Sequence, residues 1–519
     1  MYGRRTHPGA DAITTPQTES PRLNAGLRER PGERGVVGSA ARWAQAIARR
    51  DRVFVLLLAA GAALRIVAFL GYRPALLYQD SQGYLDNAAE LVPHSRWPLV
   101  YPVFLHVLPL SQGLEVIPLV QHLLALVVAA ALYVLLLRLG LRPWLAALAA
   151  APLLLDAFQL LIEQFVMTET LFELLVVGAC ALLLWRRPIP VCFVALAGLL
   201  LALAALTRVV AVLVIVPAAV TVAVAGARPS RWSAVAVLIA TFAVPLGGYT
   251  VWYHAHHGEY SLVGPTGRFL YARVAAFVDC GVVSVPPAER PLCPNEPVGE
   301  RPSSQDFAWS ATSPLYRVPE REREALAGEF ARRAIRAQPL AYARTVLADV
   351  VHGFAVKRTV TRRRVPFEDV WTFQPTFPRR AQADPVIRAY GHTGGSVQPQ
   401  LVDFLRGYQR IAFTPGPLLA AGLLLGLAAA AGVGRARQSA LRPAALLFAS
   451  LGLALYLGPA LAQQLMPRYT LPSLVLLAPA LAVAVTALTG SEPGRGARAD
   501  RRRAQTPDPS SRHAVRTGP

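Results

Sequence analysis

Apolar residues gather in ten long runs along the chain, and polar residues fill the segments between them. A helix needs about 20 mostly apolar residues to cross the hydrocarbon core of a bilayer. The runs are 53–72, 116–137, 143–158, 160–185, 189–206, 209–226, 233–252, 415–433, 443–461 and 470–489. Two of them, 143–158 and 209–226, are short, and the first could form with the next run a helical hairpin that does not cross fully. The pattern predicts an all-α polytopic membrane protein with about ten transmembrane helices.

Arginines in the short polar segments predict the orientation of these helices, because cytoplasmic loops carry an excess of Lys and Arg. With a cytoplasmic N-terminus, the inside loops hold Arg138, Arg142, Arg186, Arg187, Arg228, Arg231, Arg435, Arg437 and Arg442. The short outer turns then hold only Arg208 and Arg468, whereas the opposite orientation exports nine arginines in place of two. We therefore expect a multi-pass protein of the plasma (inner) membrane with both termini in the cytoplasm.

This orientation divides the chain into five parts. In order, they are a disordered basic cytoplasmic tail (1–50), transmembrane helices one to seven (51–252) with a first extracytoplasmic loop (73–115), a mainly helical extracytoplasmic segment (253–413), transmembrane helices eight to ten (414–490) and a second disordered cytoplasmic tail (491–519). Both tails are rich in Arg, Pro and Gly, and they contain too few large apolar residues to bury a core.

The overall charge raises the question of nucleic-acid binding. The chain has 519 residues, 54% of them apolar, and a formal net charge of +21. The arginines are spread over the tails and the short loops and do not form one basic domain. That distribution is typical of a membrane protein, so we expect no nucleic-acid partner.

The four cysteines fall into two pairs with different surroundings. Cys180 and Cys192 lie in apolar runs and are expected to pack as small apolar side chains. Cys280 and Cys293 lie in the predicted extracytoplasmic segment, on either side of a Pro-rich turn. The exterior is oxidising, which favours a disulfide, and the alternative is two unpaired thiols. A basic cluster at 357–364 is either a solvated face or a contact for anionic lipid or phosphate.

Several ionisable residues lie at or inside the predicted outer boundary of the membrane. A charge at the bilayer centre costs roughly 2.5–3.5 kcal/mol, so each is a candidate for function. They are Asp80, Asp156, Glu163, Glu169, Arg65, Arg208 and Arg468. Each also has a simpler explanation, since Arg65 can extend to the interface and either glutamate can pair with an arginine. Asp86 is expected to face solvent. Together, acids and arginines from four distant stretches at one membrane face predict a functional site.

Carboxylates and arginines at a membrane surface suit the transfer of a sugar from a lipid phosphate. Phosphate is already a stable leaving group, so one carboxylate base that takes the acceptor's hydroxyl proton is sufficient, whereas a glycosidase needs two carboxyls. We expect Asp80 to be this base, and the alternative is that it only caps a short helix beginning near Ser81. Arg208 and Arg468 are the candidates for binding the donor phosphate, because the guanidinium fork matches phosphate oxygens. Such a single displacement inverts the anomeric centre.

These residues lie in stretches that resemble a known superfamily. Asp80 stands in the first outer loop, soon after the first apolar run. The other stretches, in chain order, are WPLVYPVFLHVL (97–108), MTETLFELL (167–175), LTRVVAVLVIVP (206–217) and MPRYTLPSLVLLAP (466–479). In their order and placement they resemble the GT-C membrane glycosyltransferases, particularly bacterial relatives of the dolichyl-phosphate-mannose–protein mannosyltransferases and the lipid A aminoarabinose transferase.

The resemblance implies a catalytic Asp80, a polyprenyl-phosphate sugar as donor, and a protein, glycan or lipid as acceptor. Membrane lipids are expected as further partners. The residues expected to support the site are Glu163, Glu169, Tyr84 and Tyr469. Many members of the family carry two adjacent acidic residues in the first loop, but here Ser81 follows Asp80. That departure favours a reaction without a metal, and no cofactor is expected.

Two other classes of function fit a polytopic membrane protein. A transporter or flippase of lipid-linked sugars is the main alternative, and a receptor or assembly scaffold is a further one. A transporter is expected to carry charged groups near the midplane and towards both faces. The charged residues of this chain gather at one face, which favours an enzyme.

Overall fold

The computed structural model describes residues 51–490 apart from 227–229, 265, 357–370 and 379–382. The predicted tails (1–50 and 491–519) and the basic cluster (357–364) lie outside the described residues. Within the described part the chain is mainly helical, and its only named strands, β1 (Tyr72–Arg73) and β2 (Ser396–Val397), pair antiparallel.

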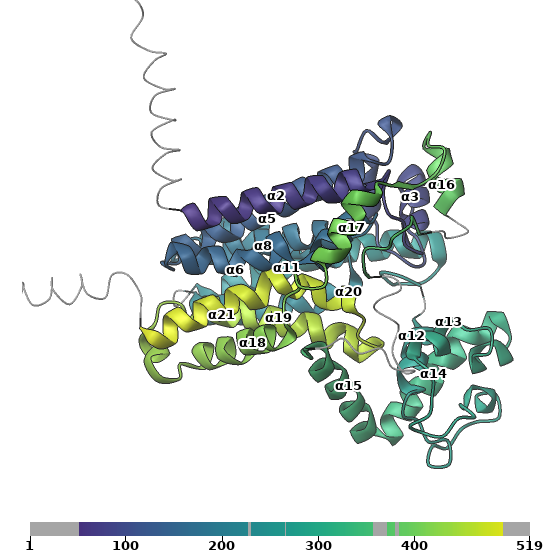
Figure 1. Cartoon of the computed structure of the whole chain (residues 1–519). Coiled ribbons are helices and arrows are strands. Elements are labelled where there is room, and N and C mark those ends of the chain that lie inside the picture. Colours follow the sequence, from purple (N-terminus) through teal and green to yellow (C-terminus); the bar gives the residue numbers. More distant parts are fainter. Residues whose placement is uncertain (1–50, 227–229, 265, 357–370, 379–382, 491–519) are drawn as a thin grey trace, which may run out of the picture. The chain divides into compact units, whose positions relative to one another are not determined.

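Each of the ten apolar runs contains helix, and many of these helices run side by side (Figure 1). They are α2 (Arg52–Gly71), α5 (Val116–Arg138), α6 (Pro143–Leu155), α8 (Glu169–Leu184), α9 (Val191–Ala205), α10 (Ile215–Ala225), α11 (Arg231–His257), α18 (Gly416–Ala431), α19 (Arg442–Ala462) and α21 (Leu474–Thr489). Among the described residues, five helices are long and apolar enough to cross a membrane, or six if one bent pair is a single span. The chain is therefore a helical membrane protein, and the figure of ten crossings stays a prediction.

The predicted continuous span 160–185 is wrong, because the chain breaks between α7 (Ala157–Gln164) and α8, and the break predicted near residue 159 lies at Asp156. The short helix α7 follows α6 at a bend of 48° and is separated from α8. Asp156 makes the first break, since its carboxylate accepts hydrogen bonds from the amides of Phe158 and Gln159. The second break is extended chain that pairs with Leu76, which donates to the Gln164 carbonyl and accepts from the Val166 amide. These distant backbone partners satisfy groups that a continuous helix would pair within itself.

Small residues allow the helices to approach closely, as is common in membrane bundles. A Cβ on Gly198 of α9 would lie 2.6 Å from the Leu238 carbonyl oxygen of α11. A Cβ on Gly422 of α18 would meet the Leu477 carbonyl oxygen of α21 at 2.1 Å. The helix pairs α9/α11 and α18/α21 are among the most extensively packed in the bundle. Glycine at these two positions is therefore required for the packing distance.

The segment between α11 and α18 contains a second apolar core. The helices of this segment are α12 (Gly267–Val274), α13 (Ser304–Trp309), α14 (Glu320–Ala337), α15 (Pro339–Gly353), α16 (Ala383–Ala389) and α17 (Pro399–Tyr408). Tyr271, Phe307 and Phe330 are the large side chains at the centre of this core. Cys280 and Cys293 pack against it and are bonded to each other, with their Cα atoms 6.2 Å apart. α15 packs on α19 and α17 packs on α2, which attaches this segment to the bundle.

Candidate functional site

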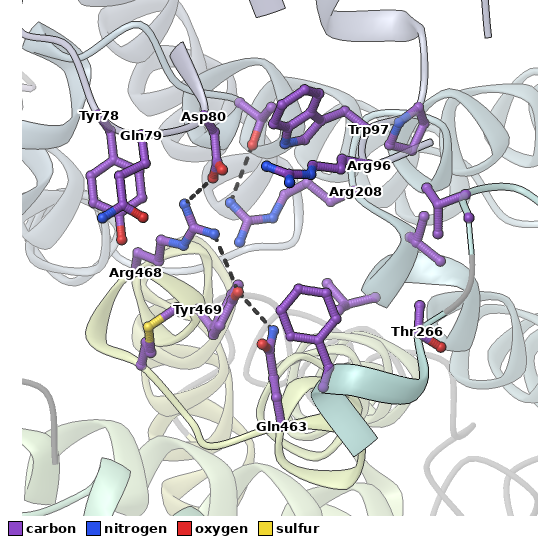
Figure 2. A pocket seen from close by; sticks show the side chains of 18 of the residues that line it. Tyr78, Gln79, Asp80, Arg96, Trp97, Arg208, Thr266, Gln463, Arg468 and Tyr469 are labelled. Carbon is purple, nitrogen blue, oxygen red and sulfur yellow. Dashed lines mark hydrogen bonds and ion pairs between the residues drawn. The ribbon is translucent and has the colours of Figure 1, made fainter. Parts of the chain in front are cut away.

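A cavity of about 870 Å³ lies where the first loop, the bundle and the segment after α11 meet (Figure 2). Its walls come from the residues before α3 (Ser81–Glu90), the start of α8, the turn before η2 (Val209–Val214), the turn after α19, and helices α12 to α14. Of the predicted site residues, Asp80, Tyr84, Glu169, Arg208, Arg468 and Tyr469 line it. Segments far apart in the sequence therefore meet at one cavity.

Asp80 uses its carboxylate for an ion pair and not for capping. The residue occupies the N-cap position of α3, but its side chain makes no capping hydrogen bond. Arg468 instead donates from Nη1 to Oδ2 of Asp80 at 2.9 Å. The alternative that Asp80 only caps the helix is therefore wrong. The side chain of Asp80 is 23% exposed, so the ion pair remains accessible from the cavity.

Arg468 is held in place by two tyrosines. It lies on α20 (Pro467–Thr470), a single turn just before α21, and its guanidinium lies 5.1 Å from the ring centres of both Tyr78 and Tyr469. Its Nη2 donates to the Tyr469 hydroxyl, which also accepts from Gln463 at 2.7 Å. Aromatic faces attract cations, so these contacts place the guanidinium beside Asp80 (Figure 2).

A second ion pair also lies close to Tyr469. Glu169 is the first residue of α8, where the partial positive charge of the helix N-terminus favours a carboxylate. It pairs with Arg208, which also donates to the Thr168 hydroxyl at 3.3 Å. The Arg208 guanidinium lies 5.5 Å from the Tyr469 ring centre, so both arginines share this aromatic ring. Glu169 is only 1% exposed, which makes this pair the more enclosed of the two.

Tyr84 lines the cavity, and its ring lies close to Trp97 and Tyr101. Burial, together with the nearby charge of Asp80, raises the pKa of the Tyr84 phenol well above its usual value. The phenol therefore stays protonated at neutral pH and is able to donate a hydrogen bond.

The outer wall of the cavity holds residues that the sequence reasoning missed. Arg268 pairs with Glu324 at 3.1 Å, and the guanidinium groups of Arg268 and Arg96 lie 4.7 and 5.7 Å from the Trp309 ring centre. The tryptophan Trp97 also lines the cavity. Trp97 does begin one of the stretches with a family resemblance, but nothing in the sequence brings it together with α12 to α14.

Glu163, predicted to support the site, does not line the cavity. It is fully buried in the bundle, where it accepts from Arg65 at 2.7 Å, from Gln159 at 3.0 Å, and contacts His122 at 2.8 Å. Arg65 is 3% exposed and also donates to main-chain carbonyls at the end of α6. The alternative that Arg65 extends to the interface is therefore wrong. Asp156 also lies apart from the site, as the cap of α7.

Two further observations concern the exposure of Asp86 and the grouping of possible metal ligands. Asp86 is exposed on α3, as predicted. Among the described residues, no three His, Cys, Asp or Glu side chains are grouped closely enough to hold a metal ion.

No family model matches the chain, and no curated protein matches it. Among solved structures, the chain is similar to the apo oligosaccharyltransferase of Archaeoglobus fulgidus, with 14% identity, a TM-score of 0.44, and coverage of 88% of this chain and 52% of that one. It is similar at 13% identity and a TM-score of 0.43 to AglB from the same organism in complex with an inhibitory peptide and a dolichol-phosphate, covering 90% and 52%. The chain spans about half the length of these proteins.

Proposed function

We propose that this protein is an integral membrane glycosyltransferase that transfers a sugar from a polyprenyl-phosphate donor to an acceptor hydroxyl at the extracytoplasmic face. The observation that carries the proposal is the Asp80–Arg468 ion pair, which faces a cavity at the end of a bundle of apolar helices. An accessible carboxylate beside arginines matches a reaction that needs one base and releases a phosphate. Apolar helices next to the cavity suit a prenyl chain.

In the proposed reaction the acceptor oxygen attacks the anomeric carbon and its proton passes to Asp80. The bond between that carbon and the phosphate oxygen breaks, and its electron pair leaves with the phosphate. Attack from the side opposite the leaving group inverts the anomeric centre. No metal is required in this scheme, because arginines stabilise the phosphate charge.

Arg208 and Arg468 are proposed to contact the donor phosphate, with Tyr469 holding both guanidinium groups. Glu169 positions Arg208, and Tyr84 offers a phenol that stays protonated. Changing Arg468 to Lys keeps the charge but removes the bidentate fork, so it should still impair transfer. The matched control is the same change at Arg336, an exposed residue of α14. If alanine at both Arg208 and Arg468 left turnover unchanged, neither would bind the phosphate.

The orientation is proposed from the arginine asymmetry and is tested by labelling. In a Cys192→Ser background, a membrane-impermeant thiol reagent is added to intact cells. Cysteine in place of exposed Thr312 should react, and cysteine in place of exposed Gln438 should not. The reverse pattern would move the cavity to the cytoplasmic face.

The central experiment is a transfer assay with purified protein in nanodiscs and a panel of polyprenyl-phosphate monosaccharides. Protein, glycan and lipid acceptors are tested in turn, and water serves as the acceptor when none is added. Release of polyprenyl phosphate from at least one donor is expected. Movement of an intact donor across the bilayer without cleavage would instead favour the flippase alternative, and the absence of cleavage from every donor would contradict the enzyme proposal.

A further inference from the structure

Three of the four arginines that line the cavity are already paired with a carboxylate that also lines it. The pairs are Arg208 with Glu169, Arg268 with Glu324, and Arg468 with Asp80. Each pair is neutral as a whole, because one guanidinium meets one carboxylate. These three arginines therefore leave no net positive charge for a substrate while their pairs persist.

Arg96 is the fourth arginine, and it has no such partner. Its guanidinium lies over Trp309, and among the described residues no carboxylate lies within ion-pair distance of it. The loop that carries Arg96 is anchored, since the Gly264 amide donates to the Ser95 carbonyl at 2.7 Å and His257 contacts the Pro93 carbonyl at 2.7 Å. The side chain is exposed to the cavity, so the lining carries one positive charge that is positioned but unpaired.

The charge of the proposed donor matches this single cation. A polyprenyl-phosphate sugar is a phosphodiester with one negative charge, whereas the polyprenyl phosphate released is a monoester with about −1.5 to −2 at pH 7. Building on the proposed function, we infer that Arg96 anchors the donor phosphate before reaction. We infer also that Arg468 exchanges Asp80 for the phosphate as the sugar leaves.

The exchange keeps every charge paired through the reaction. Before transfer, Arg96 faces the monoanionic diester and Arg468 faces the Asp80 carboxylate. As the acceptor oxygen bonds to the anomeric carbon, its proton neutralises Asp80, and the electron pair of the broken bond adds one negative charge to the phosphate. Arg468 thus loses its anionic partner at the moment when a second charge appears on the phosphate. In an enclosed site an unpaired charge is costly, so this coincidence favours the forward step.

Arg468 is suited to change partners, whereas Arg208, also proposed to contact the phosphate, keeps its pairing with Glu169. Asp80 is 23% exposed and receives one hydrogen bond from Arg468, while Glu169 is 1% exposed and stays charged in the proposed reaction. The Tyr78 and Tyr469 rings hold the Arg468 guanidinium without neutralising it. Its Nε donates to no acceptor among the described residues, so it retains capacity for a further hydrogen bond.

A binding experiment separates this exchange from a purely structural ion pair. The probes are undecaprenyl phosphate and its methyl diester, which differ by one charge at about pH 8 because the second pKa of a phosphate monoester is about 6. Affinities are measured with full-length protein in nanodiscs. Asp80→Asn frees Arg468, so it should tighten binding of the monoester roughly tenfold, as expected for one charge-assisted contact. Binding of the methyl diester should change by less than about twofold, a difference that is small on the free-energy scale.

Two further variants complete the test. Adding Arg468→Gln to Asp80→Asn should abolish the gain for the monoester, because the freed cation is gone. Arg96→Gln should weaken both probes by roughly tenfold, since both carry the first charge. Asp86→Asn, an exposed change of the same kind on α3, is the control. The inference is overturned if Asp80→Asn alters both probes alike or neither, or if Arg96→Gln alters neither.

The same experiment distinguishes failure of the inference from failure of the proposed function. Wild-type protein that binds neither probe and cleaves no donor contradicts the glycosyltransferase itself. Wild-type protein that does both, while the variants lack the predicted pattern, contradicts only the exchange. In turnover, Arg96→Gln should raise KM for the donor, whereas Arg468→Gln should mainly lower kcat. The reverse split would also overturn the assignment.

Discussion

Two groups of arginines and carboxylates, built from the same residue types, lie in this protein in different surroundings. In the interior group, Arg65 and His122 contact Glu163, and Gln159 bridges Glu163 to Glu173. Each of these side chains is no more than 5% exposed. In the cavity group, Asp80, Glu169, Arg208 and Arg468 face a volume of about 870 Å³.

The difference is whether the charges can reach a ligand. Both oxygens of Glu163 are engaged, and Arg65 also binds main-chain carbonyls of Leu153 and Leu154, so the interior group is closed and ties α2, α5, α6 and α7 together. Asp80 receives one hydrogen bond and remains 23% exposed. Removing one partner of a buried ion pair is strongly destabilising, because the other charge is left buried and uncompensated. Accessibility, and not the presence of charge in an apolar setting, therefore distinguishes the candidate site.

The largest effect that we expect from this comparison is a loss of transfer activity in the Asp80→Asn variant. The substitution keeps the shape and removes the base, so the rate should fall by about 10²–10⁴-fold while donor binding survives. The measurement is turnover of a polyprenyl-phosphate sugar beside an independent binding assay. Asp86→Asn is the matched control, because Asp86 is exposed on the same helix. Near-normal transfer by a folded Asp80→Asn protein that binds donor would remove Asp80 from the chemistry.

The interior group should respond in stability instead. Glu163→Gln leaves the buried Arg65 without its carboxylate, and breaking a buried pair in this way typically costs 3–5 kcal/mol. We expect a clearly lower unfolding temperature and lower folded yield, with turnover per folded molecule largely retained. Glu329→Gln, at an exposed position of α14, is the control. A Glu163→Gln protein with normal stability and collapsed turnover would place Glu163 in the catalytic machinery and erase the distinction.

The length of the apolar runs was enough to locate helix in all ten of them, because long apolar stretches have few other stable arrangements in a bilayer. It placed the break before α7 only to within about three residues, and it missed the break after α7 altogether. Those breaks depend on the Asp156 carboxylate and on backbone pairing with Leu76, about 90 residues away in sequence. It also ended α11 at residue 252, although the helix continues to His257. A helix that extends past the apolar run leaves no hydropathy signal.

The candidate site was partly accessible to sequence reasoning. Asp80, Arg208 and Arg468 could be grouped because each lies close to the predicted outer end of an apolar run. Glu163 and Glu169 could not be told apart, since they are six residues apart in similar apolar surroundings. Only the fold decides that one faces Arg65 and the other Arg208. The outer wall could not be predicted at all, because its contacts join the first loop to helices about 200 residues later.

A smaller effect is expected on the local stability of the outer wall of the cavity. The Cys280–Cys293 bond closes a short loop against the core of Tyr271 and Phe330, and such a bond typically contributes 2–4 kcal/mol. Replacing both cysteines by serine should speed hydrogen exchange in α12 and α14 and leave the bundle helices unchanged. Cys192→Ser, which removes an exposed free thiol, is the control. Equal hydrogen exchange in the two proteins would show that the core holds this wall without the disulfide. Recovery of both thiols free from native membranes would show that the disulfide does not form.

The smallest effect concerns pH at the rim of the cavity. His94 Nδ1 accepts a hydrogen bond from the Arg96 amide at 3.0 Å, so the unprotonated ring shapes the loop that presents Arg96. Burial and the positive charges of Arg96 and His257 lower the pKa of His94, while Glu90 and Asp86 oppose this weakly. The unfolded chain, with a His pKa of about 6.5, therefore takes up this proton first as the pH falls.

Stability from neutral His94 is thus fully present above about pH 6.5 and declines as the pH falls from there towards the lower pKa of the folded protein. We expect the unfolding temperature of the wild type to drop slightly more than that of His94→Gln over this window, because glutamine can accept the same hydrogen bond but does not titrate. Donor KM should rise in parallel for the wild type, since the Arg96 loop is disturbed. For the interior group we expect no such link between pH and donor binding. Identical pH profiles for the two proteins would show that protonation of His94 is not coupled to the cavity.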